Sequence, residues 1–499
     1  MAKTATHLIK TTMAILCLGS LLSSPLLADA PTASPPTFPE CKITPQPEHI
    51  WERGNNPWDN VPKDNHRIDI ARGWKIPNSN TWLVVGGMAK LDVYHDREAS
   101  SADPFEAPYI PPKTSIASRM NNNTKLLVRQ SNFNIATISE TRIGELKNFL
   151  EVDFAANNYF GNFAANRQYI SLNSISLRLR EIYAEINGFL FGQTATTFSD
   201  REANGYTLIH NGPSGNSQLR LPMVRYTWYN PFLVPENGSS RIMVAAEAAT
   251  TDYTQLDSTT PVSIGGISII QTSQLENDIR ILPKSRGVSP LPNFTAQARF
   301  EKKGLGHVAF RALARYLEIR PDKVTTVKDF GWGLGFSTRL FVTNYDSIFF
   351  NYSGGNGIGH YIFDLPAQSI AYNATPTAKT HSVQFGQGII LGFEHYWTEH
   401  LRTNVIAGLS QVNNARFLRV AARGRQNVPY DNDRLDAIGV NQSDVAFVNH
   451  RIQHGIINLL YKPTAELEMG VEYNHARRTT LNGQHGIAKR IQLSFIYRF

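Results

Sequence analysis

The chain has 499 residues, a formal net charge of +8 and only two cysteines, so neither a disulfide-rich scaffold nor a zinc-type cysteine cluster is available to it. Beyond its first 30 residues it nowhere approaches the run of about 18 apolar residues that a membrane-spanning helix needs. It is also much longer than one ordinary soluble domain, and it is rich in tyrosine, phenylalanine and glycine. This combination is typical of a transmembrane β-barrel, whose strands offer only half of their residues to lipid.

Residues 1–30 have the pattern of a secretory signal peptide. Lys3 and Lys10 precede an almost wholly apolar stretch over residues 13–27, and Ala28 and Ala30 offer small residues for cleavage. We expect cleavage after Ala28 or Ala30, and therefore export from the cytoplasm.

Residues 31–81 are proline-rich and show neither heptads nor sustained alternation, so we predict a short, mostly irregular periplasmic extension. Trp51, Trp58 and Trp74 suggest that part of this segment docks and plugs the periplasmic mouth of the barrel. The alternative is a loosely ordered leader.

Residues 82–499 alternate apolar and polar side chains in successive short segments, which predicts an all-β, transmembrane antiparallel β-barrel of about 16 strands. The expected strands are 82–95, 125–138, 146–155, 175–186, 189–198, 218–229, 241–250, 294–301, 307–318, 330–342, 347–363, 382–397, 401–412, 449–461, 466–476 and 486–499. Eight long loops would lie on one side and seven short turns on the other. A closed ring of this size leaves an aqueous channel.

Alternation also predicts which side chains line this channel. Outward Tyr226 and Trp228 put Arg225 inward, because neighbours on a strand point to opposite faces. The parity of strand 175–186 changes midway, so we expect a bulge near Glu181. The candidate anion path consists of Arg178, Arg180, Arg225, Arg311, Arg315 and Arg339. The alternative is a structural ion-pair network of these arginines with Asp153, Glu181, Glu185 and Glu247.

The segment between Phe198 and Gln218 connects two strands at the third long-loop position, where porins commonly fold a loop inward. Asp200, Arg201 and Glu202 are therefore candidates for the constriction of the channel. An ordinary exposed loop would have a similar composition, and this alternative stays open.

The same region carries a family resemblance. Residues 187–194 (NGFLFGQT) and 197–200 (TFSD) resemble the G-Q-T-x-S-T-F-x-D run of DcaP-like outer-membrane porins. Residues 178–180 (RLR), 211–215 (NGPSG) and 225–226 (RY) keep the order of that family. The resemblance implies a trimeric, sixteen-stranded channel for small negatively charged solutes such as dicarboxylates. Members of the family often carry an N-terminal coiled coil, which residues 29–81 do not offer.

The last expected strand places Ile491, Leu493, Phe495, Tyr497 and Phe499 on one face and Arg490, Gln492 and Ser494 on the other. Aromatic rings suit the membrane interface. We interpret Tyr497 and Phe499 as the barrel-assembly signal, on a strand that pairs with both the first and the fifteenth strand.

The sequence thus predicts a porin in the outer membrane of a Gram-negative bacterium, which lets small hydrophilic solutes diffuse and favours anions such as dicarboxylates. The expected partners are bilayer lipid, lipopolysaccharide, small anionic solutes and two further copies of the chain in a homotrimer, and no nucleic acid. We expect no cofactor, metal or catalytic site. His450 and His454 are four residues apart, but no acidic residue converges on them. The alternatives are a surface adhesin or an outer-membrane enzyme without open conductance.

Overall fold

The computed structural model describes residues 73–98, 105–113, 118, 122–155, 177–229, 238–258, 263–264, 267–268, 279–284, 287–302, 304–375, 378–423 and 448–499. The predicted signal peptide lies outside these residues, as do Trp51 and Trp58 of the proline-rich segment. Trp74 lies in the two-residue strand β1 (Trp74–Lys75), which pairs with β2 and leaves the Trp74 side chain 64% exposed. None of the described helices has the length and apolar character to cross a membrane.

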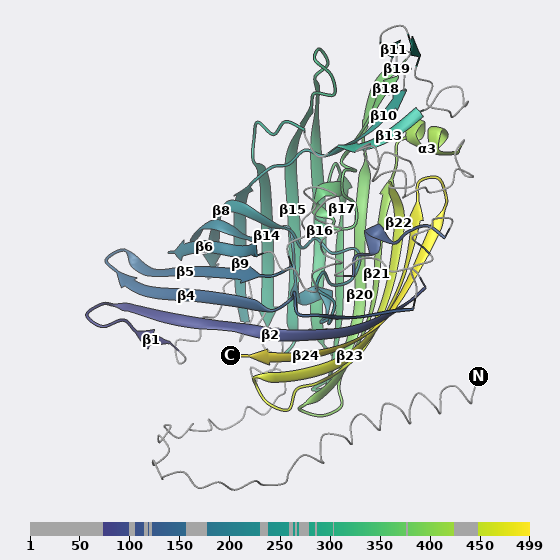
Figure 1. The fold of residues 1–499 in the computed structure, drawn as a ribbon. Coiled ribbons are helices and arrows are strands. Elements are labelled where there is room, and N and C mark those ends of the chain that lie inside the picture. The colour runs from purple at the N-terminus through teal and green to yellow at the C-terminus, as the bar shows by residue number, and fades with distance from the viewer. Residues whose placement is uncertain are drawn as a thin grey trace, which may run out of the picture. The chain divides into compact units, whose positions relative to one another are not determined.

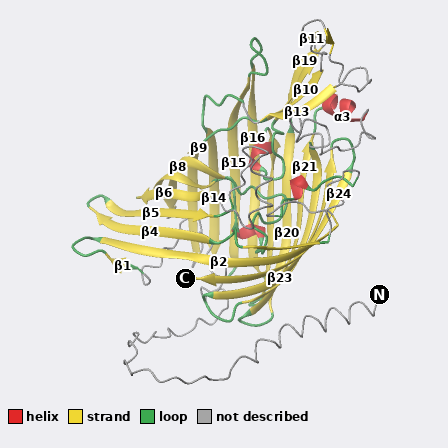
Figure 2. Ribbon diagram, in the orientation of Figure 1, coloured by secondary structure: helices red, strands yellow, loops and turns green. Residues whose placement is uncertain are grey.

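Within the described residues, sixteen strand positions close into an antiparallel barrel (Figures 1 and 2). In order around the ring they are β2 (Thr81–Glu98), β4 (Asn132–Thr141), β5 (Gly144–Asp153), β6 (Arg178–Ile186), β7 (Phe189–Ala195), β8 (Arg220–Tyr229), β9 (Gly238–Glu247), β14 (Asn293–Lys302), β15 (Gly306–Ile319), β16 (Val327–Phe341), β17 (Asp346–Asn356), β20 (Phe385–Tyr396), β21 (Leu401–Asn413), β22 (Asn449–Tyr461), β23 (Leu467–Thr480) and β24 (His485–Arg498). The short strand β3 (Asn123–Leu127) pairs with β2 just beyond β4 and shares its position. The predicted fold class is confirmed.

The ring closes where β24 lies between β23 and β2. Phe495 faces Met469 of β23 on one side and Leu91 of β2 on the other. The prediction that the last strand pairs with both the first and the fifteenth is thus confirmed. Phe499 continues this pairing, since its N–H donates to the Gly87 carbonyl (3.1 Å) and its own carbonyl accepts the Gly87 N–H (3.2 Å). We call β2, β24 and β23 the closing seam.

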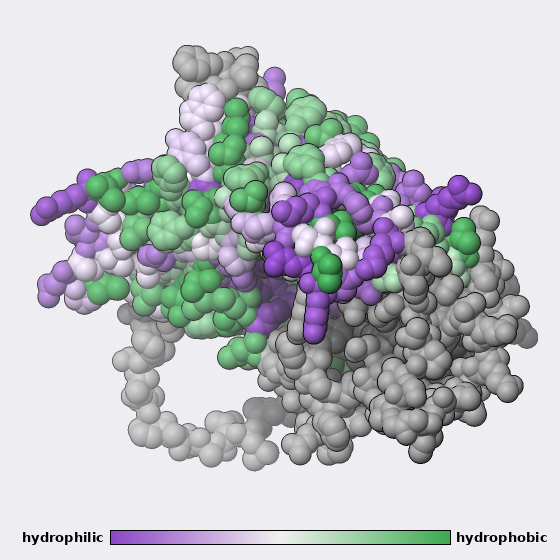
Figure 3. Space-filling model, turned by 90° about the horizontal axis from the view of Figure 1, so that it is seen from above, coloured by the Kyte–Doolittle hydropathy of each residue, from purple (hydrophilic) through white to green (hydrophobic). Residues whose placement is uncertain are grey.

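Strand β24 shows how the wall separates its two faces. Leu493 and Phe495 are 43% and 46% exposed, whereas Arg490 and Gln492 are each 2% exposed. In Figure 3, hydrophobic side chains (green) cover much of the outer surface of the wall, and hydrophilic ones (purple) gather toward its middle. An apolar outer surface around a polar interior is the arrangement that a lipid bilayer requires of a barrel.

The bulge predicted near Glu181 is present in β6. Glu151 of β5 faces Glu181, but the next residue, Val152, faces Leu179, so Arg180 is the extra residue. Leu179 (45% exposed) and Ile182 (47% exposed) therefore both point outward. The bulge lets charged residues at 178, 180 and 181 all reach the inner side, as their ion pairs show below.

The long-loop side differs from the prediction in two ways. First, not all eight connections there are long, because residues 320–326 and 481–484 are short turns between extended strands. Second, the long connections fold into a small sheet of β13 (Ile279–Lys284), β10 (Tyr253–Ser258), β18 (Ile370–Thr375) and β19 (Ala378–Val383), in that order. The strand predicted at 347–363 ends at Asn356, and the strand predicted to start at 382 starts at Phe385.

This sheet is built from two connections that are distant in sequence, since β10 and β18 pair in parallel. Its side chains pack on the ends of β15 and β16, where Tyr253, Ile370 and Tyr372 join Leu317 and Ile319. The helix α3 (Arg416–Arg423) lies on it through Leu418 and Ala422, which contact the cluster that contains Leu256 and Ala371. The two-residue strands β11 (Ser263–Ile264) and β12 (Ile267–Ser268) form a separate hairpin.

Candidate functional site

Residues 196–219, between β7 and β8, fold into the lumen, and we call them the inward loop. Their side chains are buried by the wall: Phe198 is 0%, Asp200 3% and Leu208 1% exposed. The 3-10 helix η7 (Glu202–Asn204) within this loop contacts β16, β17 and β20, which are separated from β8 in the ring by β9, β14 and β15. The inward course expected of the third loop is therefore observed.

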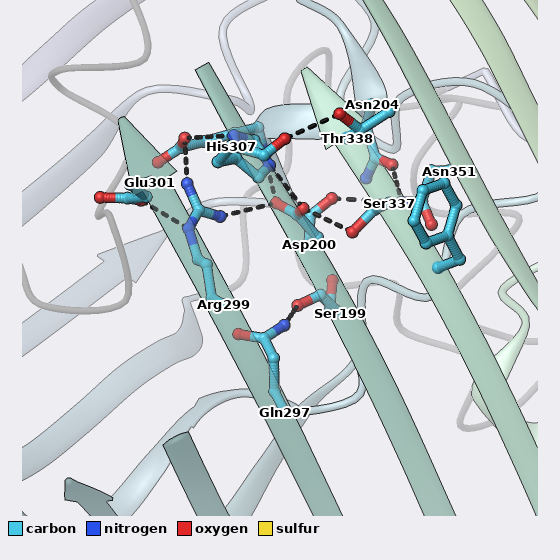
Figure 4. Close-up of polar contacts among 12 residues, drawn as sticks. Ser199, Asp200, Asn204, Gln297, Arg299, Glu301, His307, Ser337, Thr338 and Asn351 are labelled. Atoms are coloured by element: carbon cyan, nitrogen blue, oxygen red, sulfur yellow. Dashed lines mark hydrogen bonds and ion pairs between the residues drawn. The ribbon is translucent and has the colours of Figure 1, made fainter. Parts of the chain in front are cut away.

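Asp200 fastens the beginning of the loop to three adjacent strands (Figure 4). Its Oδ1 accepts from Arg299 of β14 (3.2 Å), and its Oδ2 accepts from Ser337 of β16 (2.6 Å) and contacts His307 of β15 (2.8 Å). Asp200 belongs to the loop and not to a membrane-spanning strand. Burial would raise the pKa of its carboxyl, but His307 and Arg299 hold that pKa well below its usual range.

Glu202 reinforces this attachment, because it accepts from Arg299 Nη2 at 2.5 Å and lies 3.5 Å from His307 Nδ1. Asn351 of β17 donates to the Asp200 carbonyl and to the Asn204 side chain. Asp200 and Glu202 thus turn toward the wall, whereas Arg201 turns toward Glu181 of β6, 3.4 Å away. The role of these three residues in a constriction stays a prediction.

Both ends of the inward loop lie beside a group of four arginines, which we call the arginine cluster: Arg178, Arg180, Arg201 and Arg220. Asp153 Oδ2 accepts from Arg178 Nη2 (2.6 Å) and Arg180 Nη1 (2.7 Å). Glu181 Oε1 lies 3.4 Å from Arg201 and 3.2 Å from Arg220. Glu151 contacts Arg180 as the third acid. The four side chains remain between 12% and 35% exposed.

The other predicted lumen arginines lie deeper and are held by the protein. Arg311 donates to the Phe198 carbonyl (2.9 Å) and to Asn351 Oδ1 (2.5 Å), so it ties the inward loop to the wall. Arg315 donates to the Thr250 carbonyl (2.6 Å), and Arg339 pairs with Glu394. Arg225, Arg311, Arg315 and Arg339 are all between 1% and 3% exposed. Their part in an anion path stays a prediction, and Arg178 and Arg180 are the more accessible members of the predicted set.

The acids of the alternative network have different partners. Asp153 and Glu181 pair with the arginine cluster. Glu247 instead accepts from the Thr197 N–H (2.7 Å), the Thr295 hydroxyl (2.8 Å) and the Tyr361 hydroxyl (2.9 Å). A structural network therefore accompanies the candidate anion path.

Two further segments fold inward beside the inward loop. The first is 105–113, where the Phe105 ring stacks on His454 (5.2 Å) and the Ile110 carbonyl accepts from Arg478 (2.9 Å). The second is 357–369, where Tyr361 and Leu365 are fully buried. The inward course of both segments was not predicted, because the sequence pattern places 105–113 in a loop and continues the strand that begins at 347 as far as 363, and because the partners of both segments come from distant strands.

Sequence reasoning also missed Arg220. Inward side chains of β8 are those at odd positions, such as Met223 and Arg225, so parity would send Arg220 outward. Its guanidinium reaches Glu181 because it stands at the very start of the strand, beside the inward loop. His450 and His454 contact amide oxygens, Asn414 at 3.0 Å and Asn474 at 3.1 Å respectively.

Comparison with known proteins was made by sequence and by structure. No protein-family model and no curated protein matches the sequence. The structure is similar to the outer membrane channel DcaP of Acinetobacter baumannii, with a TM-score of 0.63, 19% identity, and coverage of 86% of this chain and 99% of that one.

Two further solved structures give lower scores. An anion-selective porin from Comamonas acidovorans gives a TM-score of 0.44 at 8% identity, covering 84% of this chain and all of the other. Salmonella typhi OmpF gives 0.44 at 11% identity, covering 85% of this chain and all of the other. Scores this low add nothing to the first comparison. The chain has the sixteen-stranded antiparallel barrel fold of the DcaP channel, and the resemblance found in the sequence is confirmed at the level of the fold.

Proposed function

We propose that the chain is an outer-membrane porin that lets small hydrophilic solutes diffuse and favours anions such as dicarboxylates. The observation that carries this proposal is the arginine cluster, in which four guanidiniums face three carboxylates at the two ends of the inward loop. The local excess of positive charge lies where side chains keep contact with water. It therefore supports attraction of anions into the lumen beside the inward loop.

The arginines of this cluster share their acidic partners, and this arrangement suits weak, short-lived contacts with a passing solute. Asp153 is shared by two arginines, because Arg178 donates to both of its oxygens and Arg180 donates to one of them. Each guanidinium has five N–H donors, so donors remain for a solute carboxylate. A dicarboxylate gains most, since its two ends engage two arginines. The resident acids compete with the solute, which keeps its binding weak enough for release.

The proposal includes assembly as a homotrimer in contact with bilayer lipid and lipopolysaccharide, as in the family that the sequence resembles. Outward aromatic and aliphatic side chains of the wall, such as Phe310, Leu334 and Phe393, supply apolar surface for lipid and for neighbouring copies.

Ion selectivity tests this function. In planar bilayers with a salt gradient at low ionic strength, we expect a reversal potential that favours anions and fades at high salt, where screening acts within a few ångströms. Changing Arg178→Glu and Arg180→Glu together should weaken or reverse the preference.

Arg320→Glu is the matched control for this experiment. Arg320 lies on the long-loop side with its side chain 60% exposed, so its reversal of charge should leave the potential unchanged. A wild-type channel that prefers cations at low salt would contradict the proposed anion preference.

A surface adhesin is the second candidate function. The four-stranded sheet and α3 form a packed platform on the long-loop side, and this observation favours binding at the surface. Absence of conductance together with binding of the purified barrel to surfaces would favour this candidate over the porin.

A further inference from the structure

The apex of the inward loop, residues 206–209, lies on the closing seam. The Leu208 side chain is 1% exposed and packs with Leu460 and Ile496. A methyl group added at Gly470 of β23 would come within 3.0 Å of Leu208 and 2.6 Å of Leu460. The absence of a side chain at Gly470 therefore makes room for the apex.

Glu472 of β23 binds the main chain of this apex. Its Oε2 accepts from the Leu208 N–H (2.6 Å), and its Oε1 accepts from the Ile209 N–H (3.1 Å). The side-chain amides of Asn458 and Asn474 donate to the same two oxygens, each at 3.1 Å. Each of these asparagines uses its own oxygen elsewhere, for the Asn404 N–H and for His454 respectively, so both turn their NH₂ groups to Glu472.

The opposite side of the Leu208 peptide is held as well. Its carbonyl accepts from Lys90 Nζ of β2 (2.5 Å) and from Gln492 Nε2 of β24 (3.1 Å). Lys90 and Gln492 come from the two ends of the barrel sequence and become neighbours only when β2 pairs with β24. One peptide group of the inward loop is thus bound by all three strands of the closing seam.

We propose that Glu472 is the positioning residue of the inward loop, and that with Lys90 and Gln492 it fixes the apex on the closing seam. The inward loop can therefore adopt this position in the lumen only after the barrel has closed. This inference deepens the proposed function, because it explains how a constriction loop keeps one position while solutes pass. The contacts are made to the main chain, so the pore-facing side chains of the loop are free to vary.

The chemistry at Glu472 admits only a carboxylate. Four N–H donors converge on its two oxygens, and Glu472 is 0% exposed. A glutamine has nearly the same shape, but its NH₂ would face two of the four donors and leave them without an acceptor.

Hydrogen exchange of the apex amides tests the proposal without reference to conductance. In Glu472→Gln, we expect the amides of Leu208 and Ile209 to exchange at least roughly tenfold faster than in the wild-type barrel, because loss of a charged acceptor favours local opening. The barrel itself should keep its heat-modifiable mobility. Glu145→Gln is the control, since Glu145 is 48% exposed, pairs with Lys147 and lies away from the apex.

Substitution of Lys90 provides a second test, which can be carried out even if the Glu472→Gln variant does not assemble. Lys90→Met should also speed exchange at the apex, and Lys90→Arg, which keeps a donor for the Leu208 carbonyl, should restore protection. In bilayers, both Glu472→Gln and Lys90→Met should add flicker to the open current. Unchanged exchange at Leu208 and Ile209 in both folded variants would overturn the positioning role, whatever the selectivity of the wild-type channel.

Discussion

Replacing residues 203–214 by a short Gly-Ser linker should raise the single-channel conductance at least about twofold, because a sixteen-stranded ring is wide enough for a channel once its interior is cleared. The excised residues include the apex and its buried Leu208, and they occupy lumen that water would then fill. The linker starts after Asp200, so the attachment to Arg299 and His307 remains.

We expect the barrel wall to remain folded after this excision. Glu472 would lose the two N–H donors of the loop, but water entering the cleared lumen would hydrate its carboxylate. Removal of residues 322–325 is the control, because this turn lies outside the lumen and its Val324 is 91% exposed. Equal conductance for the excised and wild-type channels would show that the inward loop does not limit the current.

Deletion of Phe499 should impair assembly of the barrel in the membrane. Two backbone hydrogen bonds with Gly87 would be lost, and the freed Gly87 groups would face a medium that offers few replacements. Unpaired buried backbone groups cost roughly 1–3 kcal/mol each, so the equilibrium constant for folding into the membrane should fall at least about tenfold. The measurement is the heat-modifiable band after refolding into lipid vesicles.

Phe499→Tyr serves as the matched control. It keeps both backbone bonds and an aromatic ring, which lies over Gly87 in the wild-type chain. Its assembly should be close to wild type. Phe499→Asp also keeps the backbone bonds, but it places a charge where an exposed aromatic ring stood, so it should impair assembly through its side chain alone. Normal assembly of the deletion would show that the seam closes without these two bonds and would contradict the predicted assembly signal.

The wall could be predicted from the sequence because each strand carries its own evidence. Alternation in β24 separates Leu493 and Phe495 from Gln492 and Ser494, and neighbouring strands repeat the pattern. The bulge at Arg180 was predictable for the same reason, since a change of parity within one strand has no other simple explanation.

The interior was less predictable, because its contacts join residues far apart in sequence. Inward folding of the third loop followed from its position. Its attachment did not, because Asp200 binds Arg299 and Leu208 binds Glu472, on strands about 100 or more residues away in the chain. The sheet of β10 and β18 was missed because each strand is short and its partner belongs to another connection. Asp200 and Glu202 were placed in the right loop, yet their orientation toward the wall required the positions of His307 and Arg299.

The central claim is that this barrel conducts small solutes through a lumen narrowed by the inward loop and the arginine cluster. Single-channel recording of the purified, heat-modifiable wild-type protein in a planar bilayer tests it most directly. The account predicts discrete, long-lived open steps that carry more anion than cation current at low salt. Insertion of the folded barrel without any open steps would contradict the claim.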